Sequence, residues 1–239
     1  MIGQAGKILE VEPPIRSRST RARPAKAPLS EEVILDTAMR ILREEGLDAV
    51  TMRRLATELD TGPASLYVYI RSRDELLNAL LDRVGAMVPL QEPDPACWRE
   101  QIHRMVRGIL EVMEEHRGIA RVAVANVPTG ENSLRFADNL AAVLLAGGVT
   151  PRDAAWACDI LPLITVASAV ETATYQERGD ERVEVAGELA EVFTTLPSDR
   201  YPHLARLGEH LVSGDGDERF RFAIDTFLDG LVARAQRVR

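Results

Sequence analysis

The sequence of 239 residues contains few cysteines, few aromatic residues and no long apolar run. Its two cysteines, Cys97 and Cys158, are far apart and have no closely spaced Cys or His partners, which excludes a disulfide scaffold and the common zinc modules. The longest apolar run, residues 160–170, is shorter than the ~18 residues that a membrane-spanning helix needs. Because the first residues also lack the pattern of a secretory signal, we expect a cytoplasmic protein with no membrane contact.

Sequence motifs of catalysis and metal binding are absent as well. The four histidines have no metal-ligand spacing, and the chain has neither a glycine-rich phosphate loop nor a GxSxG motif. We therefore expect no enzymatic activity, no cofactor and no metal site.

Positive charge is in deficit, since 29 Lys and Arg face 37 Asp and Glu and give a net charge of −8. Residues 1–85 contain 13 basic and 13 acidic side chains, so the rest of the chain carries the whole net charge. This asymmetry indicates two regions of different electrostatic character, and for a nucleic-acid partner the distribution of charge matters more than the total.

Residues 1–28 contain four prolines and no apolar periodicity, and every charge between Pro13 and Leu29 is positive. This composition is typical of a disordered basic arm. Two interpretations of it remain open: a solvated tail without a role, or an arm that follows the DNA backbone.

Capping residues and apolar periodicity predict four short helices between residues 30 and 85. Ser30, Thr51 and Ser72 each stand where a helix N-cap is expected, and Gly46 is placed to end the first helix. The second helix is predicted over residues 52–59, and the turn Asp60-Thr61-Gly62-Pro63 joins it to a third over residues 64–70. Aspartate at position 60 tolerates the left-handed backbone that such a compact turn favours. This succession predicts a helix-turn-helix arrangement.

The third predicted helix has an unusual composition for a solvated helix. Leu66 and Ile70 lie four residues apart and can face the core. The other side chains are small residues and tyrosines, where Glu and Lys are the ordinary choice. Such a surface suits a helix that enters a DNA groove, because small residues permit close approach, hydroxyls bond phosphates and methyl groups contact thymine.

The stretch LDAVTMRRLATELDTGPASLYVYIRSRDELLNALLDRV resembles the DNA-binding domain of TetR-family transcriptional regulators, over about 50 residues. Beyond it, Trp98, the His116-Arg117 pair, Pro128-Thr129 and the segment RFRFAIDTFLDGLVAR are similar to the regulatory domain of the tetracycline-repressor branch. The resemblance implies an all-α fold. It places a three-helix helix-turn-helix DNA-binding domain at residues 29–85 and a larger helical ligand-binding and dimerisation domain at residues 86–239.

The resemblance also implies roles for individual side chains on double-stranded DNA. Thr51 would contact a phosphate, Arg53 would reach a guanine edge in the major groove, and Arg54 would contact the backbone or remain at the surface. The reading surface would consist of Pro63, Ala64, Ser65, Tyr67 and Val68, with phosphate contacts from Tyr67, Tyr69 and Arg73. The residues at positions 60, 62, 69 and 73 depart from the usual family pattern, which leaves the operator sequence open.

Each of these assignments has a structural alternative. Arg53 and Arg54 are also compatible with solvated surface charges, and Tyr67 and Tyr69 with half-buried packing. Arg73 beside Asp74 is also compatible with a weak charge pair at a helix start.

The second region is predicted to be helical throughout. The expected helices cover residues 98–116, 119–127, 134–146, 151–176, 185–196, 201–211 and 218–236, with a kink at Pro162 and a flexible link at residues 213–217. The helices at 151–176 and 218–236 are very apolar for a monomer surface. They either fill the core or form a four-helix interface in a homodimer that reads a pseudo-palindromic operator.

The resemblance implies a small-molecule effector among the helices of the second region. Candidate lining residues are Met105, Ile109, His116, Val124, Asn126, Val127, Trp156, Leu163 and Thr165, any of which is also compatible with a core role. Where the tetracycline-binding branch has a metal-ligating histidine, this chain has Ala123, so we expect a mostly apolar effector instead of tetracycline. The chain is therefore predicted to be a ligand-responsive repressor; the alternative is a helical ligand-binding or interaction protein without specific DNA binding.

Overall fold

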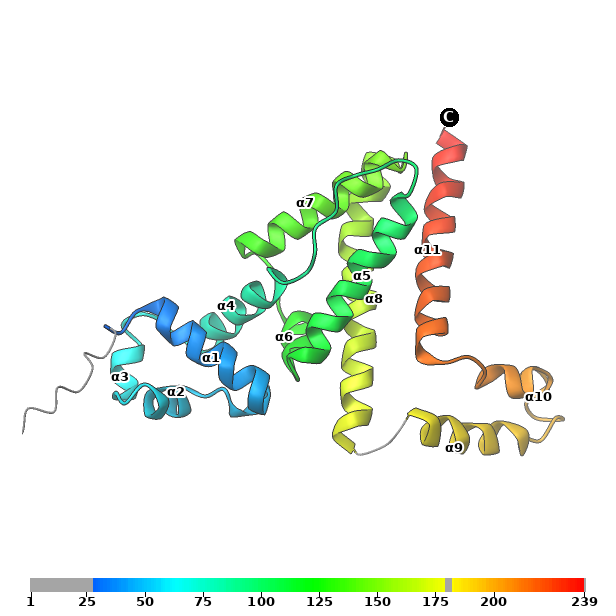
Figure 1. The fold of residues 1–239 in the computed structure, drawn as a ribbon. Coiled ribbons are helices and arrows are strands. Elements are labelled where there is room, and N and C mark those ends of the chain that lie inside the picture. Colours follow the sequence, from blue (N-terminus) through cyan, green and yellow to red (C-terminus); the bar gives the residue numbers. More distant parts are fainter. Residues whose placement is uncertain (1–27, 179–181, 239) are drawn as a thin grey trace, which may run out of the picture.

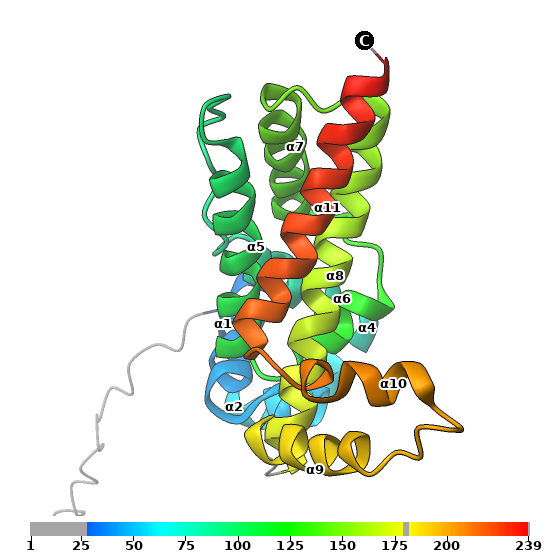
Figure 2. The same ribbon diagram turned by 90° about the vertical axis from the view of Figure 1, so that its right-hand side faces the viewer.

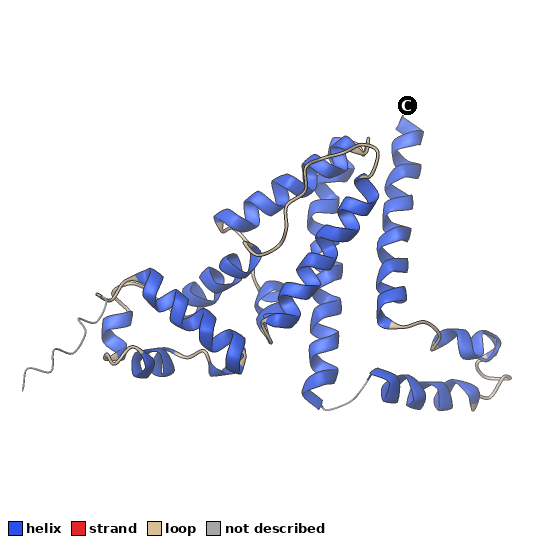
Figure 3. Ribbon diagram, in the orientation of Figure 1, coloured by secondary structure: helices blue, strands red, loops and turns tan. Residues whose placement is uncertain are grey.

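The computed structural model describes residues 28–178 and 182–238, so the basic arm predicted at residues 1–28 lies outside the described residues except for Pro28. All the regular secondary structure in the described part of the chain is helical (Figure 3). The N-terminal elements are α1 (Glu31–Glu45), the short 3₁₀ helix η1 (Leu47–Ala49), α2 (Met52–Glu58), α3 (Pro63–Leu66) and α4 (Arg73–Gly85). The elements that follow are α5 (Trp98–Glu115), α6 (Ile119–Ala125), α7 (Glu131–Ala146), α8 (Pro151–Arg178), α9 (Arg182–Thr194), α10 (Pro202–Leu207), η2 (Gly208–Leu211) and α11 (Gly216–Val238).

The predicted caps of the first helices are confirmed. The side chains of Ser30, Thr51 and Ser72 accept hydrogen bonds from the backbone N–H groups three residues ahead, at the starts of α1, α2 and α4. Gly46 ends α1 with φ of 87°, a conformation that residues with a side chain rarely adopt. Local sequence alone therefore determines where these helices begin and where α1 ends.

The third helix is shorter than the sequence predicted, because α3 ends at Leu66 and not at residue 70. Tyr67, Val68 and Tyr69 form a turn, closed by a hydrogen bond from Ile70 N to Leu66 O of 2.9 Å. Two physical reasons favour this early end. A tyrosine and a β-branched residue have low helix propensity, and Ser72 must be extended, with φ of −150°, to cap α4.

The turn before α3 contains a left-handed residue, as the sequence predicted. Asp60 has φ of 48°, which aspartate tolerates better than most residues. Gly62 then precedes Pro63, the first residue of α3. The chain thus reverses within four residues and brings α2 and α3 together as a helix-turn-helix.

The larger body is built around α5 and α8, which pack against each other and against α6 and α7 (Figure 1). α11 runs back along α8 and α5, whereas α9 and α10 form an arm beyond the end of α8 (Figures 1 and 2). Several predicted bounds differ: α7 begins at Glu131, α9 at Arg182 and α11 at Gly216, and residues 201–211 divide into α10 and η2. Each early start adds charged or polar residues to a first turn, where apolar periodicity gives no signal.

Helix α8 meets the length and hydropathy expected of a membrane span over Pro151–Tyr175, with a mean hydropathy of 1.4. The uninterrupted apolar run at residues 160–170 is much shorter than this stretch and gave no sign of it. Of the 18-residue window that meets this test, 39% is buried inside the chain. A core helix of a soluble protein has the same property, and α8 packs against α5, α6, α7 and α11.

Two connections join the helix-turn-helix to the larger body. α4 contacts α1 on one side and α5, α6 and α7 on the other. In addition, the backbone N–H of Leu47 in η1 donates to the carbonyl of Arg117, before α6, over 2.9 Å. The position of the reading helices therefore depends on both α4 and the α5–α6 turn.

Candidate nucleic-acid interface

The segment from Pro63 to Tyr69, here called the ridge, projects from the helix-turn-helix into solvent. Leu66 is fully buried, and Ile70, directly after the ridge, is 2% exposed. Around these two anchors, Val68 is 77% exposed, and the other ridge side chains are exposed as well: Pro63, Ala64, Ser65, Tyr67 and Tyr69. The predicted division between buried and outward side chains is confirmed, although α3 itself is only one turn long.

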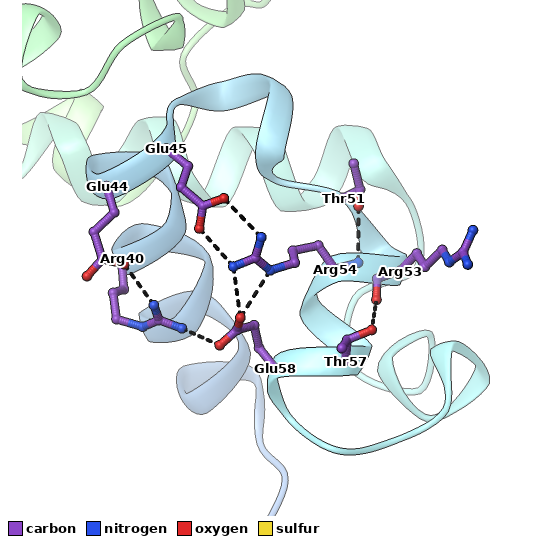
Figure 4. A network of polar contacts seen from close by, with 8 residues as sticks. All are labelled: Arg40, Glu44, Glu45, Thr51, Arg53, Arg54, Thr57 and Glu58. Atoms are coloured by element: carbon purple, nitrogen blue, oxygen red, sulfur yellow. Dashed lines mark hydrogen bonds and ion pairs between the residues drawn. The ribbon is translucent and has the colours of Figure 1, made fainter.

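The two adjacent arginines of α2 point in opposite directions (Figure 4). The guanidinium of Arg54 donates to both carboxylate oxygens of Glu45, over 2.8 and 2.9 Å, and to Glu58 over 3.0 Å. Arg53 is exposed and extends away from these carboxylates (Figure 4). Arg54 thus has carboxylate partners within the protein, whereas Arg53 is directed outward; the predicted contacts of both residues with DNA stay predictions.

Glu58 is the centre of this ion network because it also accepts from Arg40 on α1, over 2.6 Å. Hydrogen bonds from Arg54 and then Arg40 hold the pKa of the Glu58 carboxyl below its usual range. The network joins α1 to α2 on the side away from Arg53. It thereby fixes the rotation of α2 that turns Arg53 outward.

Thr51 is the N-cap of α2, and Arg73 is the first residue of α4. The Thr51 hydroxyl accepts a hydrogen bond from Arg54 N over 3.1 Å, and its side chain remains exposed. Arg73 is exposed at the first residue of α4. Both residues lie at helix N-termini, where the partial positive charge of the helix dipole favours an anion such as phosphate.

A cavity of about 160 Å³ lies between α4 and α8 in the larger body. Its wall is almost entirely apolar, with the hydroxyl of Ser133 and the thiol of Cys158 as its polar side-chain groups. The lining residues are Leu81, Val84, Gly85, Val88, Ile109, Val112, Met113, Ala123, Pro128, Ser133, Phe136, Ala137, Cys158, Pro162 and Val166. Such a wall suits an apolar ligand held by few polar contacts.

Of the effector-site residues predicted from the sequence, only Ile109 lines this cavity. Met105 and Thr165 are fully buried in the core, where the Thr165 hydroxyl donates to Leu161 O over 2.7 Å. The Asn126 side chain donates to Val122 O over 2.8 Å, within its own turn of helix. These three side chains serve local packing and backbone hydrogen bonds.

Four further predicted residues are turned away from the cavity. Trp156, Leu163, Val124 and Val127 are 51%, 53%, 53% and 82% exposed. Trp156 and Leu163 do not line the cavity because they lie on a different face of α8. The face towards the cavity carries Cys158, Pro162 and Val166. Sequence periodicity identified α8 as apolar but did not decide which of its two apolar faces lines the cavity.

His116 is buried at the end of α5 and is 1% exposed. Its Nδ1 lies 2.8 Å from Val112 O, and its Nε2 has no hydrogen-bond partner in the described part of the chain. His116 is not part of the cavity wall. Phe136 on α7 and Val88, just after α4, also line the cavity, and no signal in the sequence distinguished them from core residues.

A second, larger hollow of about 520 Å³ lies between α8, α11 and the end of the arm. Glu171, Tyr175 and Arg219 contribute polar groups to it, among apolar neighbours. It is remote from the ridge and adjoins the outer faces of α8 and α11. Within residues 28–178 and 182–238, no three His, Cys, Asp or Glu side chains are close enough together to hold a metal ion.

Comparison with known proteins gives two family matches that together span most of the chain. Residues 34–80 match the family described as "Bacterial regulatory proteins, tetR family". Residues 91–235 match the "Tetracyclin repressor-like, C-terminal domain".

Individual relatives agree with these matches. The chain is 29% identical to the HTH-type transcriptional repressor DrrR1 of Streptomyces coeruleorubidus, over 91% of this chain and 84% of that protein. It is 38% identical to the TetR family protein ActR of Streptomyces coelicolor, solved in complex with actinorhodin, over 89% of this chain and all of that one, with a TM-score of 0.81. It is also 26% identical to the class G tetracycline repressor protein of Vibrio anguillarum, over 84% and 93% of the two chains.

The ion network predicts a pH-dependent contribution of Glu58 to stability. A carboxyl with a lowered pKa stabilises the fold above the ordinary pKa of glutamate, and this contribution is lost as the pH falls through the lowered value. Replacing Glu58→Gln should lower Tm at pH 7, by no more than a few degrees because the carboxylate is exposed. The difference between parent and variant should shrink in acid, measured by thermal unfolding from pH 7 to pH 3.

Glu44→Gln is the matched control, since Glu44 contacts Arg40 within α1 and does not bridge to α2. Its effect on Tm should be smaller. Equal Tm losses for the two variants, or a Glu58→Gln loss independent of pH, would contradict the bridging role.

Proposed function

This chain belongs to the TetR family and is a ligand-responsive transcriptional repressor, and we propose that it binds a pseudo-palindromic operator as a homodimer. It leaves the operator when an apolar effector fills the α4–α8 cavity. The observation that carries the DNA-binding part is the exposed ridge, which Leu66 and Ile70 anchor to the core. Small and hydroxylated side chains are presented to solvent there, on a base that is fully packed.

The proposed DNA contacts follow from which side chains are exposed and near the ridge. Arg53 reads a base edge, while the ridge residues Pro63, Ala64, Ser65 and Val68 approach the groove. Thr51, Tyr67, Tyr69 and Arg73 contact phosphates. Arg54 has a different role in this proposal: its bonds to Glu45 and Glu58 hold α2 in place. The DNA-binding domain then corresponds to residues 29–85 and the regulatory domain to residues 86–239.

The outer faces of α8 and α11 support the homodimer. Trp156 and Leu163 on α8 and Phe222 on α11 are all more than half exposed, which is unusual for large apolar side chains. The two helices run side by side (Figure 2), so two copies related by a two-fold axis would bury these faces as a four-helix bundle. Two ridges would then meet two successive turns of the major groove.

The cavity wall supports the choice of effector class. Thirteen of its fifteen lining residues are apolar or glycine, and the cavity holds no charged side chain. Burying a charged group there would be costly, so we propose a molecule whose buried part is uncharged and largely apolar, with a group that can bond Ser133. The relative ActR is known in complex with actinorhodin, which is therefore the first compound to test.

The DNA-binding proposal is tested by selecting bound sequences from random duplexes and titrating the selected operator at several salt concentrations. Arg53→Ala should weaken operator binding by about 1–3 kcal/mol and relax discrimination at one base pair. Tyr67→Phe, the comparison variant, should weaken operator and random duplexes alike because it removes a phosphate contact. Recovery of no preferred sequence would instead favour a ligand-binding or interaction protein.

The homodimer is tested by placing a charge on the outer face of α8. Leu163→Glu should convert the dimer to a monomer in sedimentation experiments, because the carboxylate would be buried at the interface. Operator affinity should then fall by about 10²–10⁴-fold, since two linked half-sites are replaced by one. Leu134→Glu on α7, at an equally exposed leucine, should leave the dimer intact; a parent protein that sediments as a monomer would refute the proposal.

The effector class is tested on the operator complex. Actinorhodin should lower operator affinity by about 5–150-fold, the usual range of allosteric coupling. Met113→Arg places a cation in the cavity wall and should abolish this response, whereas Met87→Arg, at an exposed methionine outside the wall, should preserve it. A response that survives Met113→Arg would place the effector elsewhere.

A further inference from the structure

Asp82, near the end of α4, binds the start of α7. Its carboxylate accepts hydrogen bonds from the backbone N–H and hydroxyl of Ser133, both over 3.0 Å. It also accepts from the side-chain amide of Asn132 over 2.9 Å and, more weakly, from the backbone N–H of Asn132 over 3.4 Å. Asn132 and Ser133 lie in the first turn of α7, so a residue of α4 supplies the N-terminal cap that α7 lacks in its own sequence.

The contact is closely fitted. Gly130 precedes α7, and a Cβ atom at this position would overlap the Asp82 carboxylate. Partial burial by itself would raise the pKa of the Asp82 carboxyl, but the hydrogen bonds from Ser133 and Asn132 outweigh this effect and lower the pKa. The Asp82 carboxylate is therefore ionised and links the two helices through several hydrogen bonds.

Both ends of this link, on α4 and on α7, lie beside the cavity. Ser133 lines the cavity and donates to Asp82, and the α4 neighbours Leu81 and Val84 also line it. The next residue of α4, Arg83, forms an ion pair with Asp36 on α1. Within three residues, α4 thus contacts the cavity, the start of α7 and the first helix of the DNA-binding domain.

We propose that Asp82 is the positioning residue that transmits filling of the cavity to the helix-turn-helix, by making α4 move together with the start of α7. This inference rests on the proposed function and adds the means of its regulation. Ligand cavities usually measure about 300–1,000 Å³, so a molecule that enters this one has to displace its walls. When α7 is displaced, four hydrogen bonds carry α4 with it, and the Arg83–Asp36 pair carries the displacement to α1.

The test replaces the unidentified effector by a side chain. Ala137→Phe fills the cavity from α7, and its effect is compared in the parent and in an Asp82→Asn background. The amide nitrogen introduced by Asp82→Asn cannot accept a hydrogen bond, so at least part of the link is lost. Hydrogen exchange of the full chain is measured over residues 52–66 and 73–81 for all four proteins, after thermal unfolding has verified that each is folded.

With Asp82 present, Ala137→Phe should accelerate exchange in these segments by about threefold or more. In the Asp82→Asn background the acceleration should be confined to α5, α7 and α8, which line the cavity on its other sides. Equal acceleration in both backgrounds would overturn the proposal, because filling would then reach the DNA-binding helices without the link.

Gly130→Ala provides an independent disruption that keeps the charge of Asp82. With φ of −67° at this position, alanine fits the backbone, and only its clash with Asp82 disturbs the link. It should reproduce the uncoupling, whereas Asp217→Asn, at an exposed carboxylate paired with Arg107, should not. If Ala137→Phe fails to fold, Ala123→Leu fills the same cavity from α6.

Hydrogen exchange needs neither operator nor effector, so it separates this inference from the proposed function. Failure to select an operator would refute the repressor model while leaving the exchange result valid. Conversely, the chain could bind its operator specifically while Ala137→Phe accelerates hydrogen exchange equally in both backgrounds. That result would refute the role of Asp82 and leave the repressor model intact. If the chain binds its operator and Asp82 couples the two parts, Ala137→Phe should lower operator affinity in the parent. In the Asp82→Asn background the same substitution should change operator affinity by no more than about threefold.

Discussion

The proposed recognition surface depends on the burial of two aliphatic side chains, Leu66 and Ile70. A helix of one turn has almost no stability of its own, so α3 exists because Leu66 is packed beneath it. Ile70 fixes the end of the following turn, and Ser72 then starts α4. On this packed base the ridge can present tyrosines and small residues, at a cost in exposed apolar surface that only a partner such as DNA would recover.

Charge is used in two ways within one helix turn of α2. Arg54 is held by Glu45 and Glu58, and the electrostatic attraction in this network orients α2 against α1. Arg53, one residue earlier, is left for solvent or a partner (Figure 4). Adjacent residues of a helix lie about 100° apart, so one orientation of α2 directs Arg54 towards α1 and Arg53 towards solvent. The net charge of −8 lies in residues 86–239, so the region that presents Arg53 is neutral overall.

Helix α8 combines two apolar faces, and this accounts for its resemblance to a membrane span. Its inner face, with Cys158, Pro162 and Val166, closes the proposed effector cavity. Its outer face, with Trp156 and Leu163, is the surface proposed for the second copy. A helix that supports both a cavity and an interface needs little polar surface, and any displacement on one face is felt on the other because the helix is rigid.

The sequence by itself determined the elements whose signals are local: the caps at Ser30, Thr51 and Ser72, the left-handed Asp60, and the alternation of buried Leu66 with exposed neighbours. It also carried the family resemblance, since the helix-turn-helix is specified within about 50 contiguous residues. Tertiary structure decided which partner each side chain meets. Arg54 turned to Glu45, Trp156 and Leu163 faced outward, and Asp82 capped a helix 50 residues away in the sequence. These outcomes depend on how helices rotate and pack against one another. Helical periodicity shows which side chains share a face of a helix, but it does not show which other element that face contacts.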